Sequence, residues 1–348
     1  MIGQFGWLNF CAGAALVVTL VTGSPAPAAA DSTLTVYCSV QEEWCREMVT
    51  AFERDTGIKV AMTRKSAGET YAQIKAEAAN PRGDIWWGGT GDPHQQAAEE
   101  GLTLEYKSPM LDQLQDWAVR YAEASKFRTV GIYSGALGFG YNTDLMKKKG
   151  GAEPKCWADL LDPRFKDEVQ VADPNSSGTS WTMLATIVQI MGEDVGFDYL
   201  KKLHQNVNQY TKSGAAPATA VSQGETMIGI TFMHDMVTFA VQGAPIKVVA
   251  PCEGTGYEIG AESIIKGAKN LDTAKKWYDW ALTPDAQALA AKAKSYQVPS
   301  NKSTPVPPQA PKFSEIKLIN YDFAKYGSSA ERTRLLAKWD KEVKSLPK

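Results

Sequence analysis

The chain has 348 residues, with 37 Lys and Arg against 39 Asp and Glu, so its formal charge at pH 7 is −2. A near-neutral balance is a poor match for nucleic acid or for an anionic membrane surface, and we expect neither as a partner. Hydrophobic residues make up 44% of the chain. At about 100–200 residues per domain, the chain is long enough for two buried cores.

Residues 1–30 have the pattern of a secretory signal peptide. The apolar run from Phe10 to Val21 is too short for a comfortable membrane span, and Ala28-Ala29-Ala30 offers small residues for cleavage before Asp31. The usual basic start is missing, because the segment has no Lys or Arg. We expect export through a cleavable signal peptide, with Cys11 removed in the leader.

Strands and helices alternate through the first part of the chain. A strand over 33–37 leads to a helix with a capping-box pattern at Ser39 and Glu42, and a strand over 58–62 leads to a second capping box at Ser66 and Glu69. A third strand over 84–89 precedes a helix that Asp92 is expected to cap. This βαβαβα series predicts an α/β fold with a largely parallel sheet.

The segment 131–141 is rich in glycine and aromatic residues and is predicted to cross into a second lobe. Helices near 180–191 and 194–204, and strands over 227–232 and 246–250, would build that lobe, and a strand over 257–265 would return to the first. The predicted organisation is therefore lobe 1 (31–130 plus 257–305), lobe 2 (131–256), and a Pro-rich linker with a helical tail (306–348) packing on lobe 2.

Small polar residues follow the predicted strands, at the edge where an open α/β sheet binds its ligand. A Ser-Ser-Gly-Thr turn opens a helix, so its hydroxyl and N–H groups suit an anion, with Arg64 as the nearby guanidinium. Ser39, Ser66 and Ser213, taken singly, are better explained as helix caps than as ligand contacts. The candidate residues for this anion-binding cleft are Ser39, Ser66, Thr90, Ser176, Ser177, Gly178, Thr179 and Ser213.

His234 and Asp235 leave an apolar strand together, so we expect both to be at least half-buried. A carboxylate in a cleft is suited to accept hydrogen bonds from sugar hydroxyls, and Glu258 is a second candidate. The alternatives are that Asp235 caps a helix, that His234 bonds a backbone carbonyl, and that Glu258 is a solvated strand residue. The remaining imidazoles, His94 and His204, are expected at the surface.

The four cysteines outside the leader indicate disulfides in an exported chain, and three pairings are possible. Cys38–Cys45 and Cys156–Cys252 are favoured, and zinc is the poorer interpretation because the chain has no C-x-x-C pair. The sequence also has no G-x-S-x-G, H-E-x-x-H or P-loop motif, so we expect no enzyme, no cofactor and no resident metal.

Several segments resemble periplasmic solute-binding proteins of bacterial ABC importers, in the branch related to ferric-iron-binding proteins. The resemblance is carried by Thr35-Val36-Tyr37, by the stretch from Phe52 to Val60, by the stretch from Asp84 to Gly89, and by the stretch from Glu262 to Asn270. It implies a type II fold of two α/β lobes with the ligand cleft between them. The adjacent tyrosines that hold iron in ferric members are replaced here by the stretch from Phe232 to Met236.

The chain is similar to the hexose-phosphate-binding members of this branch. That similarity implies that His234, Asp235 and Glu258 hold the sugar, that the hydroxyl residues hold the phosphate, and that a membrane permease receives the ligand from a monomeric carrier. Phosphonate, phosphoglycerate and ferric iron remain alternative ligands. The alternative of another class is a secreted sugar-phosphate hydrolase or isomerase.

Overall fold

The computed structural model describes residue 1 and residues 33–348. The predicted signal peptide, its cleavage site and Cys11 lie outside the described residues. Residues from Ser32 to the C-terminus form one compact unit. No helix in this part of the chain is long and apolar enough to cross a membrane.

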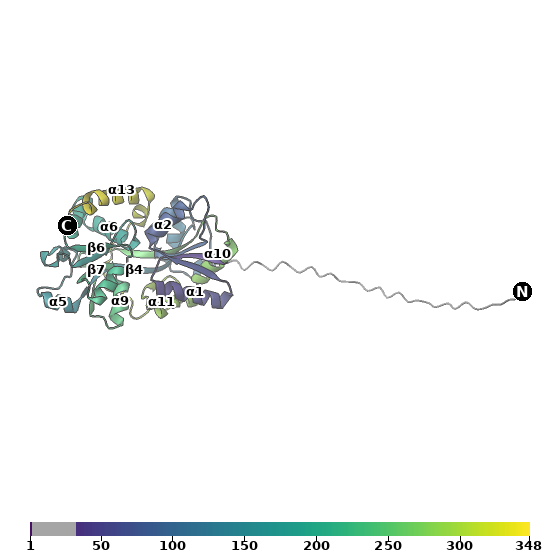
Figure 1. Ribbon diagram of the computed structural model, residues 1–348, viewed down its shortest axis with the longest axis horizontal. Helices are drawn as coiled ribbons and strands as arrows, with labels where there is room; N and C mark the ends of the chain where they lie inside the picture. Colours follow the sequence, from purple (N-terminus) through teal and green to yellow (C-terminus); the bar gives the residue numbers. More distant parts are fainter. Residues whose placement is uncertain (2–32) are drawn as a thin grey trace. The chain divides into compact units, whose positions relative to one another are not determined.

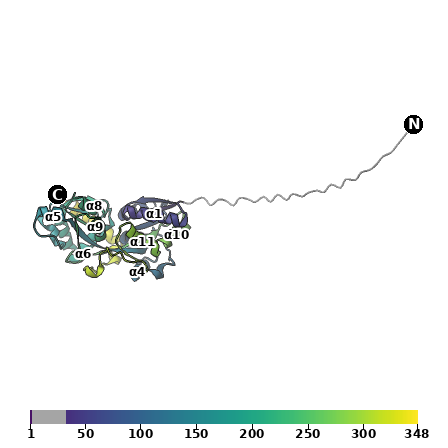
Figure 2. The same cartoon turned by 90° about the horizontal axis from the view of Figure 1, so that it is seen from below.

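A ten-stranded sheet with the order β2-β1-β3-β9-β4-β7-β5-β6 runs through this unit, and β8 and β10 pair with β4 off that path. Figure 1 shows β4 between one group of helices that includes α1, α2, α10 and α11 and another that includes α5, α6 and α9. The same two groups remain apart in the view from below (Figure 2). The fold is therefore the expected α/β architecture of two lobes.

The first lobe has a parallel group of strands, in which β1 lies between β2 and β3. Its elements are β1 (Leu34–Cys38), α1 (Glu42–Thr56), β2 (Val60–Arg64), α2 (Ala67–Ala76), β3 (Ile85–Thr90), α3 (Gly91–Glu99), α4 (Asp116–Ala124), α10 (Leu271–Ala281), α11 (Pro284–Lys292) and β10 (Val298–Pro299).

The second lobe repeats the arrangement, with β5 parallel to both β6 and β7. Its elements are α5 (Thr143–Lys149), β5 (Val169–Ala172), α6 (Gly178–Met191), α7 (Glu193–His204), β6 (Val207–Thr211), α8 (Ala216–Gln223), β7 (Ile228–Phe232), α9 (Met233–Val241) and β8 (Ile246–Val249).

Two long antiparallel strands, β4 (Val130–Asn142) and β9 (Tyr257–Ile264), connect the two groups. The first half of β4 pairs with β9 and its second half pairs with β7, so this single strand belongs to the strand groups of both lobes. The predicted crossover near 131–141 and the predicted return near 257–265 are confirmed as strands. The residue boundaries assigned to the lobes stay a prediction.

The C-terminal tail contains α12 (Phe323–Tyr326) and α13 (Ser329–Trp339). Leu335, Trp339 and Val343 are buried in one hydrophobic core with residues of β5, β7, α6 and α7. The tail also contacts the first lobe, since the backbone N–H of Ser329 donates to Glu99 at 2.7 Å. The tail is thus bonded to both lobes.

Three local expectations for helix starts are corrected. α1 has Gln41 at its N-cap position without a side-chain cap, and Ser39 instead contacts Thr70 at 3.0 Å. α3 begins at Gly91, so Asp92 lies within the helix, where it is buried and accepts a hydrogen bond from Tyr321 at 3.2 Å.

The helix after β7 begins at Met233, with Phe232 at the N-cap position, so the alternative that Asp235 caps this helix is wrong. His234 and Asp235 lie in its first turn. The capping box of Ser66 and Glu69 at α2 is confirmed. Both favoured disulfides, Cys38–Cys45 and Cys156–Cys252, are present.

His94 and His204 are buried, and the prediction that they lie at the surface was wrong. His94 stacks on Trp86 with 3.5 Å between ring centroids, accepts from Ser263 at Nδ1 and donates to the Gly88 carbonyl from Nε2. His204 contacts the Tyr210 hydroxyl and the Leu346 carbonyl, each at 3.0 Å. Polar neighbours in sequence concealed these contacts, because other elements of the fold cover both rings.

Burial lowers the pKa of His94 to about 3, against the opposing effect of its bond to Gly88. A depressed histidine pKa stabilises the fold above the unfolded-state value of about 6.5, and this stabilisation is lost as the pH falls from there toward 3. We expect His94 to account for about 2 kcal/mol of lost unfolding free energy between pH 7.5 and pH 5. Urea unfolding at both pH values should show a shallower pH dependence in His94→Gln, and an unchanged dependence would contradict the assignment.

Candidate ligand-binding cleft

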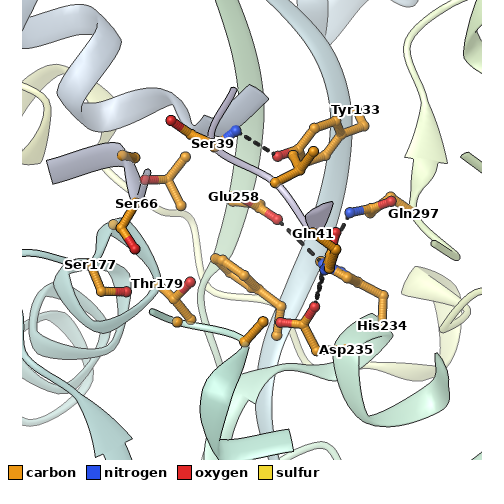
Figure 3. Close-up of a pocket in the computed structure, with 18 of the residues that line it drawn as sticks. Ser39, Gln41, Ser66, Tyr133, Ser177, Thr179, His234, Asp235, Glu258 and Gln297 are labelled. Atoms are coloured by element: carbon orange, nitrogen blue, oxygen red, sulfur yellow. Dashed lines mark hydrogen bonds and ion pairs between the residues drawn. The ribbon is translucent and has the colours of Figure 1, made fainter. Parts of the chain in front are cut away.

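A polar cavity lies where the carboxyl ends of strands from both lobes meet. It is lined by Ser39, Val40, Gln41, Arg64, Ser66, Ala67, Gly89, Thr90, Tyr133, Ser177, Gly178, Thr179, Gly214, Ala215, Phe232, His234, Asp235, Glu258 and Gln297. Figure 3 shows hydroxyl residues gathered on one side, with Ser66, Ser177 and Thr179, and the acidic and amide residues on the other. The cavity thus has two chemically distinct sides.

The structure brings together nine of the eleven residues predicted for the site and leaves out two, Ser176 and Ser213. Ser176 donates to the carbonyl of Lys212 at 3.1 Å, outside the cavity. Ser213 accepts a hydrogen bond from the guanidinium of Arg64 at 3.2 Å and lines a neighbouring outer cavity instead of this one. The predicted role of the other nine in ligand binding stays a prediction.

The hydroxyl side is built around the N-terminus of α6. Ser177 is the N-cap residue and its Oγ accepts from the backbone N–H of Ser180. The first N–H groups of a helix have no partner within the helix, so those of Gly178 and Thr179 can serve a ligand. Thr90 approaches from β3 of the other lobe, and its buried Oγ1 makes no hydrogen bond within the described residues. This side of the cavity offers donors to an anion.

Arg64 provides a positive charge at the same edge of the cavity. Its Nε donates to the Val40 carbonyl at 2.9 Å, and one terminal nitrogen donates to Ser213. Burial lowers the pKa of this guanidinium, and the negative charge of Asp235 opposes that effect. The side chain stays charged at neutral pH, because arginine starts from a pKa above 12.

The opposite side combines two carboxylates with an imidazole. Asp235 is 5% exposed and Glu258 is 3% exposed, and Nε2 of His234 lies 3.7 Å from the first and 3.9 Å from the second. Gln297 donates to Nε2 of His234 at 3.1 Å. The prediction that His234 and Asp235 are at least half-buried at the β7 exit is therefore confirmed, and Glu258 is not a solvated strand residue.

Burial raises the pKa of Glu258 well above its usual range, and the nearby Asp235 and Asp92 raise it further. Burial also lowers the pKa of His234, although Asp235 opposes this. A neutral Glu258 carboxyl can donate one hydrogen bond and accept others. This side can therefore both donate to and accept from hydroxyl groups.

Asp235 joins the two lobes in this structure. Its Oδ2 accepts from Thr231 at 2.8 Å, and its Oδ1 accepts from Nε2 of Gln41 on the other lobe (Figure 3). Gln41 and Asp235 line both the inner cavity, of about 50 Å³, and an outer one of about 630 Å³, and the two cavities also share Arg64 and Ala215. The inner cavity has room for a few water molecules only, so a sugar-sized ligand requires the two to join.

Besides Arg64, nine lining residues were not among the predicted site residues: Val40, Gln41, Ala67, Gly89, Tyr133, Gly214, Ala215, Phe232 and Gln297. Val40 and Gln41 follow Ser39 in the chain, and Ala67 follows Ser66. Extending the predicted site along these loops would therefore have included all three. Tyr133 lies within β4, where its hydroxyl accepts from the Gly89 N–H at 3.0 Å. No local pattern marks Tyr133 or Gln297 as a cleft residue.

Two lobes that are connected by shared β-strands and that both line one polar cavity are the architecture of a binding protein. Residues 89–326 match the family model described as bacterial extracellular solute-binding protein, and the chain belongs to that family. A Haemophilus influenzae protein is 47% identical over 329 residues, which cover 93% of each chain.

Two solved structures resemble the chain over nearly its whole described length. The periplasmic binding protein AfuA of Actinobacillus pleuropneumoniae, with fructose 6-phosphate bound, is 46% identical, covers 90% of this chain and 99% of its own, and has a TM-score of 0.88. The periplasmic binding protein P5PA is 40% identical, with coverages of 89% and 99% and a TM-score of 0.86. These similarities confirm the type II periplasmic-binding-protein fold.

Proposed function

We propose that the protein is the periplasmic component of an ABC importer that captures a hexose phosphate and delivers it to a membrane permease. The observation that carries this proposal is the pairing of two chemistries in one cavity. A helix N-terminus with hydroxyl groups lies on one side, and His234, Asp235 and Glu258 lie on the other. The fructose 6-phosphate found in AfuA supports the same class of ligand.

The hydroxyl side suits a phosphate group. A buried dianion is strongly unfavourable unless its oxygens are hydrogen-bonded and its charge is balanced. The N-terminus of α6 with Ser177 and Thr179 supplies donors, and Arg64 supplies a full positive charge. These groups come from both lobes, so the phosphate would be enclosed when the two lobes close around it.

The acidic side suits the hydroxyl groups of a sugar. Hydrogen bonds to a charged acceptor contribute about 1.5–3 kcal/mol each. Gln41 already donates to Asp235 here, so a sugar hydroxyl could replace that amide at the same oxygen. Movement of Gln41 would also join the inner and outer cavities and make room for the ring.

Thermal shift with glucose 6-phosphate, fructose 6-phosphate, a phosphonate and ferric citrate tests the proposal. A ligand at about 100 times its dissociation constant should add about 2.7 kcal/mol to the free energy of unfolding. Stabilisation by ferric citrate alone would instead favour a metal carrier using His234, Asp235 and Glu258. Release of phosphate from glucose 6-phosphate, or its conversion to another sugar phosphate, would reveal the enzymatic alternative.

We expect free glucose to bind at least about 100-fold more weakly than glucose 6-phosphate, because the ester adds several charge-assisted hydrogen bonds. Titration calorimetry on both compounds measures the difference. Inorganic phosphate serves as the control, since it occupies the hydroxyl side without reaching Asp235. Equal affinity for glucose and its phosphate ester would remove the phosphate from the proposal and favour an ordinary sugar carrier.

A further inference from the structure

The loop between β1 and α1 is closed by a disulfide. β1 ends at Cys38 and α1 begins at Glu42, and Cys45 in the first turns of α1 is bonded back to Cys38. All three residues between the strand and the helix, Ser39, Val40 and Gln41, line the inner cavity. The disulfide therefore closes a short ring around one wall of the site.

Each of these three residues is hydrogen-bonded to another segment of the fold. Ser39 Oγ accepts from the indole of Trp86 at 3.0 Å, which holds the loop to β3. The Val40 carbonyl accepts from Nε of Arg64 and so orients the guanidinium. Gln41 donates to Asp235 across the cleft. A displacement of this loop would therefore disturb both chemical sides of the cavity.

The helix start itself provides little to fix the loop. Gln41 occupies the N-cap position of α1 and makes no side-chain cap bond. An uncapped helix start leaves N–H groups without protein partners and frays more readily. The sulfur bridge lies one turn further in, and both cysteines are 1% exposed in the core of the first lobe. The covalent bond thus takes the place of a cap.

We propose that the Cys38–Cys45 disulfide is a positioning device for the ligand site, which holds Ser39, Val40 and Gln41 against the cavity. Loss of this disulfide weakens ligand binding by more than its effect on the stability of the fold explains. The choice of ligand in the test rests on the proposed function. The second disulfide provides a matched control, because Cys156 and Cys252 do not line the inner cavity.

The test uses the compact unit from Ser32 onward, which omits Cys11. Calorimetry with glucose 6-phosphate compares Cys38→Ala/Cys45→Ala with Cys156→Ala/Cys252→Ala. The first pair is expected to lose about tenfold in affinity, whereas the second stays within about twofold while its melting temperature falls. Amide exchange of residues 39–45 in the ligand-free protein should accelerate only in the first pair. Equal affinity in the two variants would overturn the proposal.

If Cys38→Ala/Cys45→Ala fails to fold, the Cys156→Ala/Cys252→Ala protein is measured before and after treatment with a phosphine. The phosphine reduces the remaining disulfide to two thiols and leaves as its oxide, with oxygen taken from water. Lower affinity after reduction supports the proposal, and unchanged affinity with two titratable thiols overturns it. If glucose 6-phosphate does not bind the unaltered protein, the proposed ligand is wrong. Amide exchange at residues 39–45 then decides the positioning role alone, and unchanged rates overturn it.

Discussion

Asp235→Ala should weaken binding of glucose 6-phosphate by about 10- to 100-fold while the protein remains folded. The carboxylate is buried at the start of α9, where its Oδ1 faces Gln41 in the cavity. A sugar hydroxyl at that oxygen would lose a charged acceptor in the variant.

The fold should tolerate this change because the other contact of Asp235 has a substitute. Thr231 Oγ1 lies 2.8 Å from Oδ2 of Asp235 and also 2.8 Å from the carbonyl of Gly214, to which it can still donate. Asp235→Asn keeps the shape but loses the charge, and we expect an intermediate loss of affinity. Asp194→Ala, at a fully exposed side chain, is the control.

Calorimetry gives the affinity, and circular dichroism with urea unfolding gives the state of the fold. Unchanged affinity in a folded Asp235→Ala protein would reduce Asp235 to a structural contact between the lobes. The role of Asp235 in sugar binding would then be withdrawn, whatever the effect on stability.

Much of the fold could be predicted because apolar runs, glycine turns and helix signals follow one another at regular intervals. The same order also located most of the cleft, since Ser39, Ser66, Thr90 and the turn from Ser176 to Thr179 lie at strand ends or within a few residues after them. In an open α/β sheet the ligand binds outside the carboxyl ends of the strands, so a residue at a strand end is placed near it.

The parts that could not be predicted depend on contacts between distant segments. Gln297, just before β10, contacts His234, and Tyr133 within β4 contacts Gly89. Neither residue has a distinctive local pattern. His94 was expected at the surface because its own helix is polar around it. Its burial is decided by Trp86 on β3 and Ser263 on β9.

Gly68→Ala is expected to weaken ligand binding by about 5- to 150-fold without destabilising the ligand-free protein. Gly68 lies in the first turn of α2, in the first lobe. A Cβ at this position would lie 2.7 Å from the Ser176 carbonyl oxygen and 2.8 Å from that of Asn175, both in the turn before α6. Because these are backbone atoms, they cannot rotate away, and the two lobes would have to separate.

The same substitution is favourable for the helix by itself. Alanine is preferred over glycine within a helix by up to about 1 kcal/mol. The open form should therefore be at least as stable as in the unaltered protein, while the closed form is strained. Gly196→Ala in α7 is the matched control, since its Cβ would approach no closer than 3.3 Å to Ile187 and Val188 of the same lobe.

Three measurements separate these effects. Calorimetry reports the affinity for glucose 6-phosphate, urea unfolding reports the stability of the ligand-free protein, and small-angle scattering with saturating ligand reports closure. Gly68 does not line the inner cavity, so a loss of affinity in Gly68→Ala cannot come from a missing ligand contact. Unchanged affinity together with a normal ligand-induced decrease in radius of gyration would mean that ligand binding does not require Gly68 to approach the turn before α6, and the enclosed phosphate site proposed for this cleft would be wrong.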